Sequence, residues 1–339
     1  MARYAVVIAA GAALLVTAII GIVLVPLLHR LKFGQTINDL GPTWHRGKQG
    51  TPTMGGFLFM IGSTAGLVVA YPLLAGVSTD ADPMASGLLL LGLFTALAFG
   101  AVGFLDDFLK VIRKQNLGLR AAAKLVMQFT IAICFLATLY LMGRLSTLVR
   151  LPFLGPVDFG IFFYPLSVIL IVGLVNAVNL TDGIDGLATM VTLWVMCGFF
   201  LLLTLFGRYQ LSLWAAALAG SCVGFLFWNF YPAKVFMGDT GSMFLGGAVV
   251  ALGYCMGRPD ILVILSLVYL LEALSVMLQV GWFKITKKRY GKGRRIFKMT
   301  PIHHHFEMTG WSEVKIDVVF SFLTLACVVI AYIYAYLLG

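Results

Sequence analysis

The sequence contains few charged residues. Aspartate, glutamate, lysine and arginine make up 11% of its 339 residues, whereas they make up about 25% of an average soluble domain. Hydrophobic residues account for 60% of the chain, and the mean hydropathy is +0.98. Because so few polar side chains cannot cover a water-soluble globule, the composition predicts an integral membrane protein whose solvent is the lipid bilayer.

Several motifs for nucleotide and metal chemistry are absent. The chain has neither a GxxxxGK[ST] loop nor a GxGxxG loop after a strand, so ATP hydrolysis and dinucleotide redox chemistry are not supported. Its five cysteines include no CxxC pair, and all of them fall within apolar runs. We therefore interpret them as small buried apolar residues: Cys134, Cys197, Cys222, Cys255 and Cys327.

Long apolar runs predict an all-α protein with about ten transmembrane helices. A helix needs about 20 apolar residues to cross the hydrocarbon core. The first run is too long for a signal peptide and no small-residue cleavage site follows it, so we interpret it as a retained span. We expect a single polytopic transmembrane domain over 1–339, with its longest loop over 284–315. The runs cover residues 5–28, 53–74, 86–105, 121–142, 160–178, 184–206, 210–230, 241–257, 261–283 and 316–338.

The distribution of positive charge predicts the orientation. The chain has 24 lysines and arginines against 14 acids, a net charge of +10. If both termini are periplasmic, every lysine and all but five arginines lie in cytoplasmic segments, as the positive-inside rule requires. We interpret the excess as a topology signal and expect no nucleic-acid partner. A basic cytoplasmic face also attracts anionic lipids and phosphorylated substrates.

Acidic residues gather at the predicted cytoplasmic ends of three helices. Asp106 and Asp107 close the third run, Asp182 and Asp185 open the sixth, and Asp239 opens the eighth. Carboxylates at one depth repel each other unless a cation lies between them. Oxygen ligands without cysteine favour Mg²⁺, or Mn²⁺, over zinc. Taken singly, Asp182 or Asp239 also suits a helix N-cap, and Asp106 with Asp107 suits a solvated pair at the membrane edge.

Three further features carry polar chemistry. A basic stretch, Lys284–Lys298, precedes three consecutive histidines, His303–His305. Neighbouring helical residues point about 100° apart, so the triplet predicts a polar surface patch that binds phosphate or sugar and not one zinc site. The loop His45–Gly56 offers glycines and hydroxyls to phosphate. Glu272, midway along the ninth run, is expected to form an interhelical hydrogen bond.

The segment Leu148–Phe159, with Pro152, Gly155 and Pro156, predicts a periplasmic hairpin.

Together these motifs resemble one family of membrane enzymes. Asp106-Asp107 and the Asn-x-x-Asp-x-x-Asp motif are shared across the polyprenyl-phosphate N-acetylhexosamine-1-phosphate transferases. The histidine motif is more specific, and the whole chain resembles the phospho-N-acetylmuramoyl-pentapeptide transferases (translocase I). The matching segments are Gly50–Gly56, Asp106–Asp107, Asn179–Ala188, Ala233–Ser242 and Pro301–Glu307.

The resemblance implies a reaction, a cofactor and partners. The substrates would be UDP-MurNAc-pentapeptide and undecaprenyl phosphate, and the products lipid I and UMP, with Mg²⁺ required. It also implies a homodimer in the bacterial inner membrane.

The resemblance further implies roles for individual residues. Asp239 is the implied Mg²⁺ ligand, and Asp106 is the implied base for the lipid phosphate or the nucleophile of a two-step route. Asp107 would support Asp106, and His304 is grouped with these catalytic residues. The implied substrate-binding residues are Lys48, Thr53, Lys110, Lys124, Asn179, Asp182, Asp185, Asn229, Phe236, Gly238, His303 and His305.

Two alternatives stay open at this point. A transferase that uses UDP-GlcNAc would share the acidic motifs, although the histidine motif argues against it. A cation-coupled transporter would also place carboxylates in a membrane, but usually near the bilayer midplane and within internal repeats.

Overall fold

The computed structural model describes residues 2–31, 48, 50–75, 83–113, 118–152 and 154–338. Within this part, nine helices are long and apolar enough to cross a membrane. They confirm an all-α integral membrane protein and nine of the ten expected runs. These helices are α1 (Ala2–Arg30), α2 (Gly56–Ala75), α3 (Ala85–Arg113), α4 (Ala121–Leu141), α5 (Phe163–Thr181), α6 (Leu187–Leu205), α7 (Tyr209–Asn229), α10 (Leu267–Tyr290) and α12 (Glu313–Leu338).

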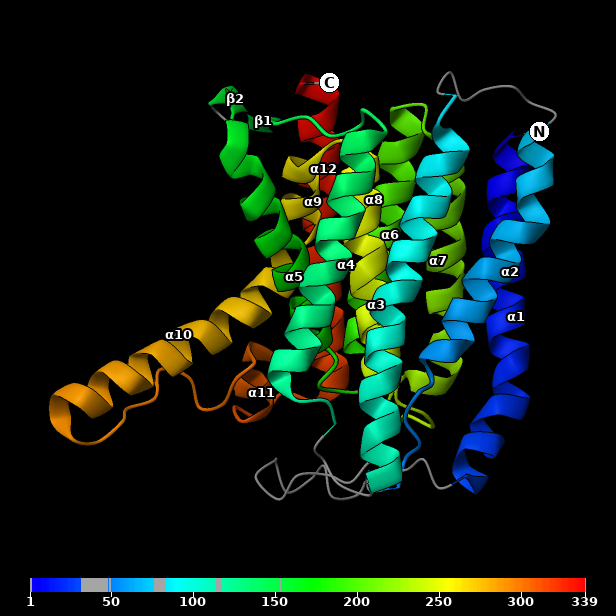
Figure 1. Cartoon of the computed structure of the whole chain (residues 1–339). Coiled ribbons are helices and arrows are strands. Elements are labelled where there is room, and N and C mark those ends of the chain that lie inside the picture. The colour runs from blue at the N-terminus through cyan, green and yellow to red at the C-terminus, as the bar shows by residue number, and fades with distance from the viewer. Residues whose placement is uncertain are drawn as a thin grey trace.

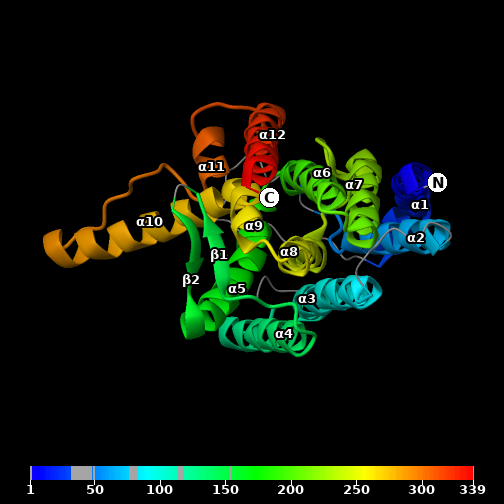
Figure 2. The ribbon, with the colours of Figure 1, turned by 90° about the horizontal axis from the view of Figure 1, so that it is seen from above.

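The remaining expected run, the eighth (241–257), forms α8 (Gly238–Cys255), which lies in the middle of the bundle (Figure 2). Every residue from Thr240 to Cys255 is buried, and α8 packs against α3 and α5. Its 18 residues correspond to about 27 Å of helix. A helix that meets other helices all round can use glycine and alanine where a lipid-facing helix needs long apolar side chains. This explains why α8 is not among the nine helices that are apolar enough by themselves to cross a membrane.

Both ends of the described chain lie on one side of the bundle, opposite the C-terminal ends of α3 and α5 (Figure 1). This arrangement agrees with an even number of crossings when α8 is counted with the other nine helices. The remaining elements are β1 (Leu148–Leu151), β2 (Gly155–Asp158), a 3₁₀ turn (Gly160–Phe162), α9 (Pro259–Leu265) and α11 (Ile302–Glu307). Strands β1 and β2 pair antiparallel and confirm the expected hairpin.

Helix α1 is held by two glycine pairs that the sequence reading did not use. On α2, an ideal Cβ on Gly62 would lie 1.9 Å from Thr17 Oγ1, and one on Gly66 would lie 2.5 Å from the Ala9 carbonyl oxygen. Gly220 and Gly224 of α7 approach the backbone of α1 equally closely from another side. Such small-xxx-small spacing lets helices pack closely within a membrane.

Several expected boundaries are wrong. Helix α3 continues to Arg113, so Asp106 and Asp107 lie inside a helix and do not close it. The ninth run is broken at Ser266 into α9 and α10. Helix α10 then continues to Tyr290, well into the stretch expected as a loop.

Helix α10 leaves the bundle, and its C-terminal half extends away from the other helices (Figures 1 and 2). Among the cysteines, Cys222, Cys255 and Cys327 are buried as expected, whereas Cys134 is exposed and Cys197 is half-buried. Both exceptions lie on long apolar helices, so burial by protein was the wrong expectation for Cys134.

Candidate active site

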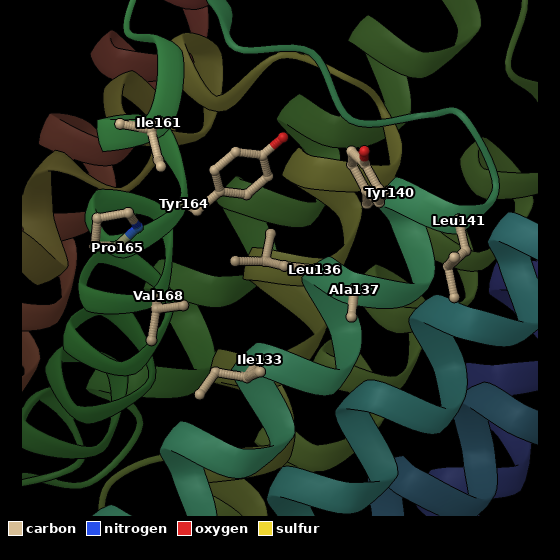
Figure 3. A pocket seen from close by; sticks show the side chains of 9 residues that line it. All are labelled: Ile133, Leu136, Ala137, Tyr140, Leu141, Ile161, Tyr164, Pro165 and Val168. Carbon is tan, nitrogen blue, oxygen red and sulfur yellow. The ribbon is translucent and has the colours of Figure 1, made fainter.

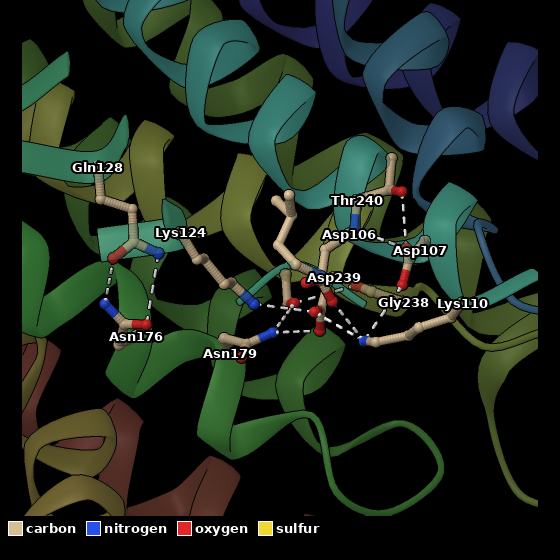
Figure 4. A network of polar contacts seen from close by, with 12 residues as sticks. Asp106, Asp107, Lys110, Lys124, Gln128, Asn176, Asn179, Gly238, Asp239 and Thr240 are labelled. Atoms are coloured by element: carbon tan, nitrogen blue, oxygen red, sulfur yellow. Dashed lines mark hydrogen bonds and ion pairs between the residues drawn. The ribbon is translucent and has the colours of Figure 1, made fainter. Parts of the chain in front are cut away.

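Three carboxylates from two helices meet where the C-terminal part of α3 lies beside the first turn of α8 (Figure 4). One oxygen from each of Asp106, Asp107 and Asp239 lies within 4.8 Å of the others. Asp106 and Asp107 come from α3, and Asp239 comes from the first turn of α8. Gly103 permits this approach, because an ideal Cβ there would lie 2.0 Å from the Asp239 carbonyl oxygen. We call these residues the acid cluster.

Two lysines neutralise most of this charge. Lys110, one turn after Asp106 on α3, places Nζ 2.6 Å from Asp106 Oδ2 and 2.9 Å from Asp239 Oδ2. Lys124 of α4 places Nζ 2.9 Å from the same Asp239 oxygen. With the carboxylates ionised, these five groups carry a net charge of −1, which leaves room for a divalent cation and the phosphates that accompany it.

Asp107 has a structural task within the cluster. Its Oδ2 accepts hydrogen bonds from Thr240 N at 2.9 Å and Thr240 Oγ1 at 2.7 Å. An acceptor at this position satisfies a free N–H in the first turn of α8, as an N-cap residue would. The N-cap interpretation of Asp239 is wrong, because Met237 occupies that position and the Asp239 side chain faces the lysines.

The C-terminal end of α5 places an amide against the cluster and a carboxyl near it. Asn179 Nδ2 donates to Asp239 Oδ1 and to Ser242 Oγ, both at 2.8 Å. Asp182 follows at the end of α5. Burial, together with the negative charges of Asp239 and Asp107, raises the pKa of Asp182 well above its ordinary value. Asp182 is therefore electrostatically coupled to the acid cluster.

Asp185 and Lys48 belong to a second network, separate from the acid cluster. Lys48 Nζ lies 2.7 Å from Asp185 Oδ1 and 2.6 Å from Glu313 Oε2. Burial alone would lower the pKa of Lys48, but hydrogen bonds to Asp185 and Glu313 raise it above its ordinary value. Asp185 Oδ2 also accepts from Ala233 N at 2.9 Å. Lys48 therefore stays charged, and it ties three distant segments together.

The sequence reading missed Glu313 and Asp317, which extend this second network. They are one helical turn apart at the start of α12. Asp317 is fully buried, and neither carboxylate oxygen has a hydrogen-bond partner among the described residues. The i,i+4 spacing of two acids at the cytoplasmic end of the last predicted span was the available signal.

The first histidine of the triplet is buried and not part of a surface patch, so the expectation is wrong for His303. Its side chain is 0% exposed, and Nδ1 lies 3.0 Å from Glu272 Oε2. This contact between α10 and α11 confirms the interhelical hydrogen bond expected of Glu272. The opposite nitrogen faces the loop after α5, where an ideal Cβ on Gly183 would lie 2.2 Å from Nε2.

The other two histidines face different partners, as the 100° spacing requires. His304 Nδ1 lies 2.5 Å from Glu307 Oε2. His305 Nδ1 accepts from Lys298 N at 3.1 Å. The triplet thus connects α11 to α10 through His303 and to the segment at Lys298 through His305, whereas His304 contacts Glu307 within α11.

Replacing Glu272 with leucine is expected to lower the stability of the protein by about 1–3 kcal/mol, because it leaves a buried imidazole nitrogen without a partner. Thermal unfolding of the protein in detergent measures this as a lower Tm. Glu272→Gln keeps an acceptor for His303 and should recover part of the loss. An unchanged Tm for Glu272→Leu would show that the contact does not stabilise the fold.

Asn229 is already bonded within the protein. It is 2% exposed, accepts from Thr189 Oγ1 at 2.8 Å and donates to the Val235 carbonyl at 3.1 Å. Its amide therefore holds the turn after α7, which in turn places Phe236.

Phe236 and the loop before α2 are joined through their backbones. Phe236 N donates to the Pro52 carbonyl, and its own carbonyl accepts from Gly55 N, both at 2.8 Å. Thr53 is buried, and an ideal Cβ on Gly238 would lie 2.5 Å from its Oγ1. Gly238 has φ +70°, which glycine adopts without strain. Of the predicted phosphate loop, residues 45–47 and 49 lie outside the described residues.

A cavity of about 640 Å³ lies between α4 and α5 and is separate from the acid cluster (Figure 3). Its lining comes from the end of α4 and the start of α5, whereas Lys124 and Asn179 lie at the opposite ends of these helices. Tyr140 and Tyr164 supply its polar atoms. The cavity therefore contributes no charged group to the site.

A membrane helix bundle with carboxylates and lysines gathered at one face is suited to transferring phosphate groups at the bilayer surface. Comparison with known proteins assigns this class: residues 89–257 match the family model described as Glycosyl transferase family 4. The match contains the whole acid cluster and the loop after α5, but neither Lys48 nor the histidine triplet.

Relatives with curated names define the family more closely. A phospho-N-acetylmuramoyl-pentapeptide-transferase of Clostridium botulinum (strain Eklund 17B / Type B) is 44% identical over 319 residues, 93% of this chain and 92% of the relative. That of Clostridium perfringens (strain 13 / Type A) is 44% identical, covering 94% and 95%. That of Heliobacterium modesticaldum (strain ATCC 51547 / Ice1) is 46% identical over 299 residues, 88% of each chain.

The chain belongs to the phospho-N-acetylmuramoyl-pentapeptide-transferase family. It is therefore a phosphoglycosyl transferase, that is, an enzyme and not a cation-coupled transporter.

Proposed function

We propose that this enzyme transfers phospho-MurNAc-pentapeptide from UDP-MurNAc-pentapeptide to undecaprenyl phosphate, giving lipid I and UMP with Mg²⁺ as cofactor. The names of the relatives support the substrates. The observation that carries the chemistry is the acid cluster with its two lysines. It offers hard oxygen donors beside cationic groups that attract phosphate, at the end of a membrane bundle.

The donor set of the acid cluster fits Mg²⁺. Carboxylate oxygens from two helices lie within 4.8 Å of one another, and Mg²⁺ prefers one or two carboxylates completed by substrate phosphates. Asp239 is the residue we propose as its ligand, with Asp106 and Asp107 in reach. When bound, Mg²⁺ neutralises charge that develops on the diphosphate.

The protein's own groups account for the remaining tasks. Lys110 and Lys124 hold positive charge where phosphate oxygens would approach, and Asn179 orients Asp239. Asp106 accepts a hydrogen bond from Leu119 N at 2.9 Å, which fixes one of its oxygens. The other oxygen, Oδ2, pairs with Lys110 Nζ at 2.6 Å, and it is the one we propose either to take the proton of the lipid phosphate or to attack the sugar-bearing phosphorus.

These two roles of Asp106 differ in a measurable way. If Asp106 is the nucleophile, radiolabelled UMP should exchange into UDP-MurNAc-pentapeptide without any undecaprenyl phosphate, because a covalent enzyme intermediate forms reversibly. If Asp106 is the base, exchange requires the lipid acceptor. Asp106→Asn protein supplies the background in both cases.

The remaining predicted residues are proposed as the nucleotide and phosphate pocket around the cluster. Asp182 and Phe236 lie on the loops that precede α6 and α8, and His304 lies on α11 at the same end of the bundle (Figure 1). The second network is proposed to hold the nucleotide side of the site. With Lys110 and Lys124, the proposed substrate-binding residues are Lys48, Thr53, Asn179, Asp182, Asp185, Phe236, Gly238 and His305, whereas the buried Asn229 and His303 would shape the pocket through their own hydrogen bonds.

The direct test is UMP release by the detergent-purified protein. Undecaprenyl phosphate is supplied with UDP-MurNAc-pentapeptide or with UDP-GlcNAc, each with and without Mg²⁺. We expect Mg²⁺-dependent release with the muramyl substrate alone. Release with UDP-GlcNAc alone would keep the mechanism and overturn the substrate, and no release from folded protein would contradict the proposal.

We place the enzyme in the bacterial inner membrane as a homodimer, with both termini periplasmic and the acid cluster at the cytoplasmic face. Reporter tags fused to either terminus should be accessible from the periplasm, because the lysines then remain on the cytoplasmic side. A cysteine placed in the loop at Lys292 should be labelled only after the cells are opened. Labelling at Lys292 in intact cells would reverse the orientation.

A further inference from the structure

The end of α10 and the segment that follows it carry a dense group of positive charges. Residues 273–306 contain no aspartate or glutamate. All the lysine and arginine side chains over 284–298 are exposed, and within the described chain none of them forms an ion pair with a carboxylate. Arg289 and Arg294 lie over the ring of Tyr290. We call this set the basic tip: Lys284, Lys287, Lys288, Arg289, Lys292, Arg294, Arg295 and Lys298.

The part of α10 before the basic tip has an apolar outer surface. Met277, Leu278 and Trp282 are 63%, 49% and 45% exposed. Helix α10 leaves the bundle (Figures 1 and 2), and this exposed apolar surface is suited to contact with lipid. Trp282 and Tyr290 are residue types that favour the membrane–water interface. The basic tip therefore emerges at the level of the lipid headgroups.

The basic tip is held in shape by hydrogen bonds between α10 and the segment that returns along it. Gln279 Oε1 accepts from Ile296 N at 2.8 Å and from Phe297 N at 3.0 Å. Thr286 Oγ1 accepts from Arg294 N at 2.9 Å. Cations on both segments are thus presented together, which lowers the entropy that is lost when they bind a common partner.

We propose that the basic tip is a binding surface for anionic phospholipid headgroups. Eight exposed cations lack carboxylate partners, lie beyond the protein bundle and follow an apolar, lipid-facing stretch of helix. Phosphodiester groups of the surrounding leaflet supply the opposite charge at that depth, and juxtamembrane lysines and arginines gain favourable energy from them. Lys298 N, on the segment that returns along α10, donates a hydrogen bond to His305 Nδ1. A lipid bound at the basic tip would therefore also restrain the histidine triplet.

Native mass spectrometry of the purified full chain in detergent tests this binding with phosphatidylglycerol and phosphatidylcholine as probes. We expect the wild-type chain to prefer phosphatidylglycerol. A variant with Lys284→Gln, Lys287→Gln, Lys288→Gln and Lys292→Gln should lose that preference by at least about tenfold, with phosphatidylcholine binding unchanged. The matched control removes four exposed cations elsewhere at the same end of the bundle and should keep the preference: Arg30→Gln, Arg113→Gln, Lys234→Gln and Lys315→Gln.

Three results would overturn the proposal. They are equal affinity of the wild-type chain for both lipids, equal loss in the two variants, or loss of phosphatidylcholine binding together with phosphatidylglycerol binding in the first variant. If the first variant does not fold, the wild-type preference must still fall as salt is raised, because exposed charges are screened. No nucleotide sugar is present, so the outcome is independent of the proposed transferase reaction.

Discussion

Asp239→Asn is expected to abolish Mg²⁺-dependent UMP release, with a loss of at least about a thousandfold, or about 4 kcal/mol of transition-state stabilisation. The Asp239 carboxylate accepts from Lys110, Lys124 and Asn179. An amide at this position has no charge to hold a cation, and its NH₂ group would face donors. The measurement is UMP release over a range of Mg²⁺ concentrations.

Asp158→Asn is the matched control for this experiment. Asp158 lies on the β1–β2 hairpin, on the side of the membrane opposite the acid cluster, and the same chemical change there should leave turnover unchanged. The Asp239→Asn protein should also unfold at a temperature close to that of the wild type. Near-normal turnover by Asp239→Asn would remove this residue from the catalytic core.

Gly103→Ala is expected to separate α3 from α8 and to lower turnover by about a hundredfold or more. The added Cβ would lie 2.0 Å from the Asp239 carbonyl oxygen, a backbone atom that cannot move aside alone. Such overpacking typically costs about 1–3 kcal/mol. A shift of about 1 Å between catalytic groups is enough for a large loss of rate. Turnover and Tm are both measured.

The control for this substitution is Gly173→Ala on α5. Gly173 is also helical, but an ideal Cβ there meets nothing within 4 Å. Its Tm and turnover should match the wild type. If Gly103→Ala behaved like Gly173→Ala, the close approach of α3 and α8 would not be what assembles the acid cluster.

The acid motifs were recognisable in the sequence because acids are rare in an apolar chain. Asp106, Asp107 and Asp239 stood at predicted helix ends on one side of the membrane, and the structure brings them together. Their partners were less visible. Lys110 and Lys124 appeared as two of many cations near the cytoplasmic ends, and no local pattern connected either of them with Asp239.

The division of the polar residues into two groups was not predictable. Asp182 and Asp185 are three residues apart, yet Asp182 lies in the electrostatic field of the acid cluster and Asp185 binds Lys48. The direction of each side chain depends on the turn between α5 and α6 and on which helix faces it. Glu313 reaches Asp185 across 128 residues of sequence, a separation over which sequence spacing carries no information about contact.

By itself, the sequence determined that this is a membrane helical enzyme with its acids at one face. Hydropathy and charge distribution follow from the free energy of placing each residue in lipid or in water, and this is largely a property of the residue. Only the tertiary structure decided that α8 is enclosed by other helices, that His303 is buried against Glu272, and that α10 leaves the bundle. These features depend on close packing between distant segments, where the space beside each glycine decides which helices can meet.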